Sequence, residues 1–180
     1  LKTIASSLIA AVMCSSLAVS SAETVSTEDW QLVWSDEFDG DAINTEFWTH
    51  EVDCWGGGNE ERQCYTALPT NAFVKDGNLH IVVRKEAVEG PALPPHMRET
   101  DEQKNAKKVQ PFTSARLNTK GKAFWTYGKF EVRAKMPEGQ GMWPAIWMLP
   151  EEDHYGTWAA SGEIDIAEVV NLGAKCRRCE

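Results

Sequence analysis

Three carboxylates lie close together in residues 161–170, which read SGEIDIAEVV. Glu163, Asp165 and Glu168 are interleaved with β-branched residues, a pattern that favours a half-buried strand over a helix. On a helix the side chains of Glu163 and Glu168 would diverge by roughly 140°. Held on one face of a strand, two such carboxylates have the groups needed to cleave a glycosidic bond.

A regular strand would separate these acids, because its side chains alternate between two faces. Glu163 and Asp165 would share one face and Glu168 would lie on the other. One extra residue near Ile166 or Ala167, a β-bulge, returns Glu168 to the face of the other two. The Cα atoms of the two glutamates would then lie on the order of 13 Å apart. Side chains that lean together could bring the carboxyl groups to ~5–6 Å, which fits a retaining glycosidase better than an inverting one.

Aromatic residues come just before the acids. In residues 139–150, GQGMWPAIWMLP, strict alternation places Trp143 and Trp147 on one face, and Trp158 leads into the acidic stretch. An indole offers a flat apolar surface to a sugar ring together with an N–H donor. Core packing is the alternative for such a tryptophan pair. An isolated E-x-D-x-x-E motif is equally compatible with a solvated acidic face, so the surrounding sequence has to decide.

The motif G-x-W-P-A-x-W-M-L followed by S-G-E-I-D-I-x-E resembles glycoside hydrolase family 16. The bulged acidic motif is similar to the laminarinase type, the endo-1,3-β-glucanases. The resemblance implies an all-β, concanavalin-like jelly-roll β-sandwich and retaining endo-hydrolysis of β-1,3-glucan without a required cofactor. Glu163 would be the nucleophile, Glu168 the general acid and base, and Asp165 would tune the pair.

Two other functions stay open. One is another family 16 specificity, for mixed-linkage glucan, agar or carrageenan. The other is a β-glucan-recognition protein that has lost hydrolysis, whose signature would be the loss of a catalytic glutamate. Both Glu163 and Glu168 are present, which favours an enzyme.

Further site residues follow from the same resemblance. Residues 54–66, CWGGGNEERQCYT, are similar to the laminarinase motif N-x-E-x-Q-x-Y-T, which would place Asn59 in the sugar cleft. T-S-A-R at 113–116 makes Arg116 a sugar-contact candidate, with a structural ion pair as the alternative. The stretch SDEFDG at 35–40 resembles the start of family 16 domains. A structural calcium site there would use Glu37 and Gly77, unless the stretch is an ordinary polar turn.

The N-terminus indicates the compartment. Lys2, an apolar run over residues 4–19 and the small residues that end at Ala22 predict a secretory signal peptide over residues 1–22. Residues 23–180 are then expected to form the catalytic domain, truncated at its C-terminal side because family 16 domains continue with further strands. The protein is expected to be extracellular, with the periplasm as alternative, and monomeric, with no membrane attachment after signal cleavage.

The net charge of −9 and the absence of a basic cluster argue against nucleic acid as a partner. A neutral polysaccharide suits an acidic protein better than a strongly sulfated one. Beyond the predicted signal peptide four cysteines remain, and four allow three disulfide connectivities. The pair Cys54–Cys64, which closes the glycine-rich loop, is favoured over pairings with Cys176 or Cys179. The histidines show no metal-ligand spacing.

Hydrophobic alternation and turn residues predict the elements that would carry the site. Residues 86–111 are rich in polar residues and prolines and are interpreted as a long surface loop. The turn Asp76–Gly77 is expected to lead into a strong strand ending at residue 85. The other predicted strands cover residues 30–34, 47–51, 112–119, 124–135 and 142–149.

Overall fold

A computed structural model describes residues 30–174 of the chain. The chain divides into two compact units, residues 1–35 and residues 36–180. Of the first unit, residues 30–35 are described, and they form neither helix nor strand. The strand predicted at residues 30–34 is therefore wrong. Apolar alternation alone does not make a strand, because a strand also needs a hydrogen-bonded neighbour.

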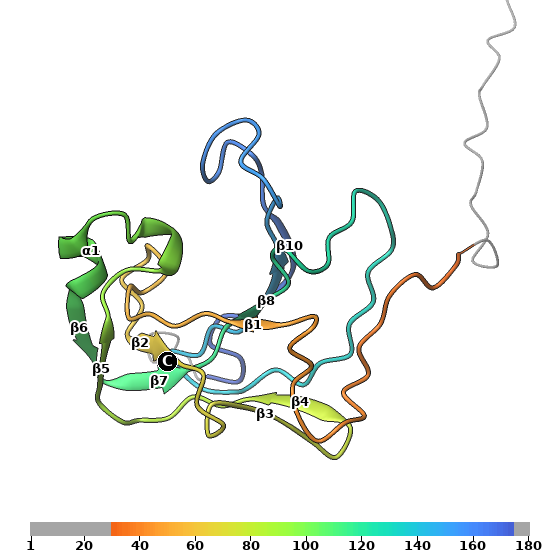
Figure 1. The fold of residues 1–180 in the computed structure, drawn as a ribbon. Coiled ribbons are helices and arrows are strands. Elements are labelled where there is room, and N and C mark those ends of the chain that lie inside the picture. The colour runs from red at the N-terminus through yellow and green to blue at the C-terminus, as the bar shows by residue number, and fades with distance from the viewer. Residues whose placement is uncertain (1–29, 175–180) are drawn as a thin grey trace, which may run out of the picture. The chain divides into compact units, whose positions relative to one another are not determined.

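The ten strands of the described part pair two by two (Figure 1). The pairs are β1 (Thr49–His50) with β8 (Leu117–Asn118), β2 (Gln63–Tyr65) with β7 (Phe112–Ser114), β3 (Ala72–Lys75) with β4 (Asn78–Ile81), β5 (Val88–Pro91) with β6 (Lys107–Gln110), and β9 (Ala145–Met148) with β10 (Ile164–Glu168). The pair β2–β7 is parallel and the other four are antiparallel.

The hairpin β3–β4 follows from its turn residues. Asp76 and Gly77 both have positive φ, 51° and 67°. A two-residue turn of this kind matches the twist of the strands it joins, and Asp-Gly is among its preferred sequences. The predicted turn and strand are confirmed, although β4 ends at Ile81.

The loop predicted at residues 86–111 is wrong, because this segment folds into β5, a 3₁₀ helix η2 (Pro95–Met97), α1 (Asp101–Asn105) and β6. Helix α1 begins with a capping box: the Thr100 hydroxyl accepts a bond from the Gln103 N–H, and the Gln103 side chain accepts one from the Thr100 N–H. The T-x-x-Q spacing is the sequence signal of this cap. No helix in residues 30–174 has the length and hydropathy needed to span a membrane.

Two of the predicted strands are interrupted or missing. The strand predicted at 112–119 is broken into β7 and β8, which pair with different partners. The strand predicted at 124–135 is wrong, since residues 124–135 form no ladder with any strand of the described part. Side chains such as Phe124 and Tyr127 are exposed there, so the alternation does not correspond to a buried face.

A buried disulfide holds the glycine-rich loop. Cys54 and Cys64 are bonded and almost fully buried, which confirms the predicted pairing. Strand β5 passes so close that a Cβ on Gly90 would lie 2.7 Å from the Cys54 sulfur. The Cys54 N–H also donates to the Pro91 carbonyl (2.7 Å). The loop is therefore anchored to the hairpin β5–β6. Cys176, Cys179 and the predicted signal peptide lie outside the described residues.

Candidate active site

Strand β10 carries the β-bulge that the spacing of the acids requires. Asp165 pairs with Trp147, and the next pairs are Ala167 with Ile146 and Glu168 with Ala145, so the register shifts between Asp165 and Ala167. The predicted bulge is confirmed. Because directly paired residues of a ladder lie on the same face, Asp165 and Glu168 share a face with Trp147.

Glu163 lies just before β10, two residues from Asp165, so regular alternation places it on the same face. The ladder continues beyond the far end of β10, where the N–H groups of Val169 and Asn171 donate to the carbonyls of Pro144 and Met142 (3.1 and 2.9 Å). This pairing keeps Trp143 beside the end of the acidic strand.

Each of the two glutamates accepts a hydrogen bond from a tryptophan. The Trp143 indole Nε1–H donates to Glu168 Oε1 (2.7 Å), and the Trp158 Nε1–H donates to Glu163 Oε2. A turn brings Trp158 back to Glu163: Ser161 Oγ accepts the N–H of Tyr155 (2.9 Å) and donates to the carbonyl of Gly156 (2.6 Å). The structure thus brings Trp143 and Trp158 to the acids, with their N–H edges directed at the carboxylates.

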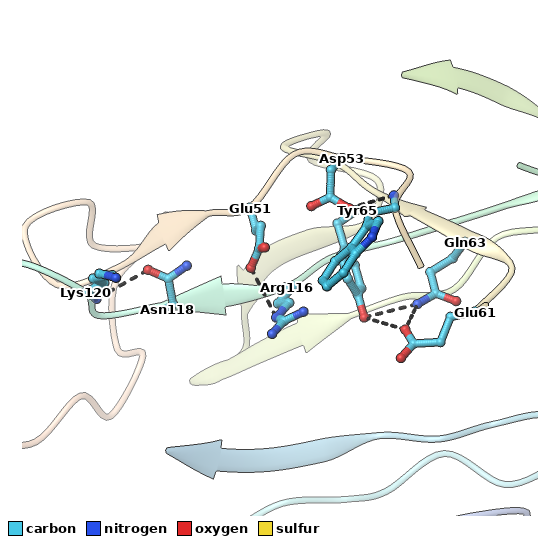
Figure 2. A network of polar contacts seen from close by, with 9 residues as sticks. Glu51, Asp53, Glu61, Gln63, Tyr65, Arg116, Asn118 and Lys120 are labelled. Carbon is cyan, nitrogen blue, oxygen red and sulfur yellow. Dashed lines mark hydrogen bonds and ion pairs between the residues drawn. The ribbon is translucent and has the colours of Figure 1, made fainter. Parts of the chain in front are cut away.

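Arg116 approaches the same face from the connection between β7 and β8. Its guanidinium carbon lies 4.5 Å from the ring centre of Trp147 and 5.6 Å from that of Tyr65. Its Nε forms an ion pair with Glu51 Oε2 (3.1 Å). Figure 2 shows Arg116 directed toward Glu51, with Tyr65 nearby. Arg116 therefore has the structural ion pair that was the alternative to a sugar contact, and it also contacts the predicted sugar platform Trp147.

A polar network connects Asn59 to this arginine, and Figure 2 shows its members Glu61, Gln63 and Tyr65. The Tyr65 hydroxyl donates to Glu61 Oε2 (3.0 Å), and Gln63 Nε2 donates to Glu61 Oε2 (2.6 Å) and to the Tyr65 oxygen (3.0 Å). Asn59 Nδ2 reaches the other Glu61 oxygen at 3.4 Å. Tyr65 in turn lies against Arg116. Asn59 and Arg116, separately predicted as sugar contacts, thus belong to one connected set of side chains.

Sequence reasoning missed four members of this network: Glu51, Glu61, Gln63 and Tyr65. For three of them a signal was present, since residues 61, 63 and 65 alternate and a strand places such residues on one face. Glu51 had no comparable signal. Its ion pair joins residues 65 positions apart in the chain (116 − 51), and only the fold brings them together.

The surroundings shift the pKa values of two side chains of the network, Tyr65 and Glu51. Burial raises the pKa of Tyr65 to about 12, and the neighbouring Glu61 carboxylate acts in the same direction while Arg116 opposes it. Burial also raises the pKa of Glu51, and the charge of Asp53 adds to this. Arg116 and His96 lower the Glu51 pKa, but the net shift is upward.

The Tyr65 shift predicts a loss of stability in alkali. The unfolded chain releases the tyrosine proton near pH 10 and the folded chain only near pH 12, so the free energy of unfolding falls across this interval. Two pH units correspond to about 2–3 kcal/mol. Tyr65→Phe should remove this part of the loss, whereas Tyr127→Phe, at an exposed tyrosine, should leave it intact. Urea unfolding at several alkaline pH values measures the slope, and equal slopes for both variants would contradict the prediction.

Two further acids, Asp36 and Asp39, lie beside the predicted calcium ligands Glu37 and Gly77. A Cβ on Gly77 would lie 3.9 Å from Asp39 Oδ1, which places the turn near an acid other than Glu37. The Asp36 carboxylate accepts the Phe38 N–H (3.0 Å) and the Trp48 indole N–H (2.8 Å). Within residues 30–174 no group of three or more His, Cys, Asp or Glu side chains is arranged to hold a metal ion. Calcium binding by Glu37 and Gly77 stays a prediction.

Known proteins are similar to this chain in both sequence and fold. A β-glucanase from Rhodothermus marinus is 46% identical over 147 residues, 79% of this chain and 45% of that protein. A β-1,3-glucan-binding protein from Penaeus monodon is 32% identical over 188 residues, 89% of this chain and 50% of that protein. The chain therefore spans half or less of the length of these relatives.

The catalytic domain of an endo-1,3-β-glucanase (laminarinase) from Thermotoga petrophila RKU-1 superimposes with a TM-score of 0.66 at 41% identity, covering 80% of this chain and 53% of that one. This agreement confirms the predicted all-β, jelly-roll β-sandwich class. The family model described as "XgeA-like, catalytic GH16 domain" matches residues 86–177, just over half of the chain and including the whole bulged acidic strand. The chain belongs to glycoside hydrolase family 16.

Proposed function

We propose that the protein is a retaining endo-hydrolase of β-1,3-glucan. The observation that carries the proposal is the bulge in β10, which gathers Glu163, Asp165 and Glu168 on the face of Trp147. The names of the relatives, a β-glucanase and a laminarinase, support the same substrate class. The acidic net charge of −9 agrees with a neutral polysaccharide.

In the first step the Glu163 carboxylate attacks the anomeric carbon, and Glu168 gives its proton to the departing glycosidic oxygen. The sugar is then held as an ester on Glu163. In the second step Glu168 takes a proton from water, the water oxygen attacks the same carbon, and the bond to Glu163 breaks. Two inversions at one carbon retain its configuration.

The hydrogen bonds of the site suit these roles. Trp158 donates to one oxygen of Glu163, which holds the carboxylate in a fixed orientation and leaves its other oxygen for attack. Trp143 orients Glu168 in the same way. We assign Asp165, between the two on the same face, the role of tuning the pair. Two carboxylates and water suffice for both steps, so we propose no cofactor for the chemistry.

The surroundings of the acids would bind the polysaccharide. We assign the sugar contacts near the acids to Trp143, Trp147 and Trp158. Two further contacts are assigned to Asn59 and Arg116, which belong to the polar network. The predicted signal peptide supports secretion, and we propose that the protein acts as a monomer outside the cell.

A binding protein without hydrolysis is the second candidate, because the similar protein from Penaeus monodon is named a β-1,3-glucan-binding protein. Such a protein would keep the sugar contacts without needing both glutamates. Here Glu163 and Glu168 are both present, and each is oriented by an indole donor. This arrangement favours the enzyme.

Release of reducing sugar from a panel of polysaccharides tests the assignment. We expect release from laminarin at a higher rate than from lichenan, and none above background from agarose or carrageenan. Release from agarose or carrageenan in preference to laminarin would contradict the assigned substrate. Tight binding of laminarin by the folded protein without any release would replace the enzyme with the binding protein.

A further inference from the structure

The ion pair Glu51–Arg116 is the one sheltered ion pair among those found in residues 30–174. Its side chains are 14% and 23% exposed, against 77% and 46% for Glu131–Lys129 and 97% and 54% for Asp101–Lys104. Exposed pairs contribute little to stability, and a sheltered pair is costly to break because one charge is left without its partner. The Glu51 carboxylate is therefore expected to fix the position of the Arg116 guanidinium.

The backbone fixes this pairing. Strands β1 and β8 pair Thr49 with Asn118 and His50 with Leu117, and the ladder continues where the Glu51 N–H donates to the Arg116 carbonyl (2.9 Å). Directly opposed residues present their side chains on the same face. The carboxylate and the guanidinium are thus neighbours because of the strand register.

Arg116 in turn covers Trp147. A guanidinium carbon 4.5 Å from the ring centre occupies one face of the indole. Trp147 is paired with Asp165 on the strand that carries the acids. A sugar ring can therefore stack only on the opposite face of the Trp147 indole. The orientation of the indole plane in turn depends on where the Arg116 guanidinium lies.

We propose that Glu51 is a positioning residue for glucan binding, which holds Arg116 against Trp147 and so sets the orientation of the indole platform beside the acids. Tyr65 supports Arg116 from a second side, at 5.6 Å. Glu51 acts through these two residues and takes no part in bond cleavage. The inference rests on the proposed function, because it assigns a role in binding the same glucan.

The test is the affinity for laminarihexaose, measured by isothermal titration calorimetry in a Glu163→Gln background that cannot turn the ligand over. Adding Glu51→Gln keeps the shape of the side chain and removes its charge. We expect about tenfold weaker binding at neutral pH. Adding Glu131→Gln instead, at an exposed ion pair, should leave the affinity unchanged. With Glu163 intact, Glu51→Gln should raise KM while kcat changes less than about twofold.

A second variant separates positioning from folding. Arg116→Lys keeps the positive charge but loses the flat group that stacks on Trp147. Arg116→Lys should weaken binding by a similar factor. The double variant Glu51→Gln/Arg116→Lys should bind no more weakly than the weaker-binding of the two single variants, because both changes break one chain of contacts. Additive losses in the double variant would overturn the inference. Circular dichroism establishes that each variant is folded. If Glu51→Gln does not fold, the Glu163→Gln parent itself decides the matter, because protonation of Glu51 removes the same charge: an affinity unchanged from neutral pH to about pH 4 would overturn the inference.

The pH dependence of the affinity for laminarihexaose separates positioning by the Glu51 charge from a merely structural role. The charged groups around Glu51 are Arg116, Asp53 and His96, and burial raises the Glu51 pKa above its usual 4.5. At about pH 4, below this raised pKa, most of the wild-type carboxyl is protonated and resembles the glutamine. The affinities of the Glu163→Gln parent and its Glu51→Gln derivative should therefore converge at about pH 4 and differ at neutral pH.

The outcomes are distinct. Equal affinities of parent and Glu51→Gln at neutral pH, or a difference that stays constant from neutral pH to about pH 4, would overturn the role of Glu51 alone. Absence of laminarihexaose binding by the folded parent and by every variant would overturn the proposed function, and the role of Glu51 with it.

Discussion

Replacing Glu163 with glutamine is expected to abolish the release of reducing sugar from laminarin, with a loss in kcat on the order of 10⁴- to 10⁶-fold. The amide has nearly the shape of the carboxylate, and its oxygen can still accept the Trp158 N–H. It carries no negative charge with which to attack the anomeric carbon. The change therefore removes the nucleophile and leaves its surroundings in place.

Initial rates on laminarin measure this effect. Glu131→Gln, an equivalent change at an exposed glutamate, should retain the wild-type rate. Trapping with a slow 2-fluoro glycoside should add the mass of the sugar to the peptide containing Glu163 in the wild type and not in the variant. A Glu163→Gln protein within tenfold of wild type would remove Glu163 from the mechanism.

Replacing Glu168 with alanine is expected to slow hydrolysis of laminarin by about 10²- to 10⁴-fold, the usual contribution of a general acid and base. Natural glucan needs a proton on its departing oxygen, whereas a nitrophenyl leaving group does not. A nitrophenyl β-laminaribioside should therefore still transfer its sugar to Glu163, and the ester should then accumulate because no base activates water.

Azide separates the roles of the two acids, since it attacks without losing a proton. With Glu168→Ala it should restore turnover and yield the β-glycosyl azide, formed by attack on the ester. With Glu163→Ala it should enter the vacated nucleophile position and yield the α-azide. Nuclear magnetic resonance identifies the anomer of each product. The opposite pairing of products and variants would show that the roles of Glu163 and Glu168 are exchanged.

The parts of the site that local spacing determines were predictable from the sequence. The bulge follows from the spacing of Glu163 and Glu168, which are five positions apart, because no regular strand places both on one face. Its position between Asp165 and Ala167 is confirmed. The disulfide Cys54–Cys64 and the Asp76–Gly77 turn are likewise set by residues near one another in the chain.

The parts that depend on distant residues were not predictable. Alternation predicted a strand at 124–135, but a ladder requires a partner that the pattern does not reveal. Nothing near Glu51 in the sequence indicates that it meets Arg116. The tryptophans were predicted as stacking surfaces, and their bonds to Glu163 and Glu168 depend on how the ladder and the turn before β10 orient them.

Residues 86–111 show how composition misleads. Prolines and polar residues suggested an irregular loop, yet Pro95 begins a 3₁₀ turn, Thr100 caps a helix, and β5 pairs with β6. The local signals of each element were present, but none had the period of a long strand or helix. The segment matters for the site because it packs on the disulfide loop that carries Asn59.

The anomer first released from laminarin tests the central claim most directly. Proton nuclear magnetic resonance during the first minutes of hydrolysis distinguishes the product before it equilibrates in water. A retaining mechanism that uses Glu163 and Glu168 predicts the β-anomer first, with the α-anomer appearing only by mutarotation. The α-anomer as first product would contradict the account, because it would mean a single displacement by water.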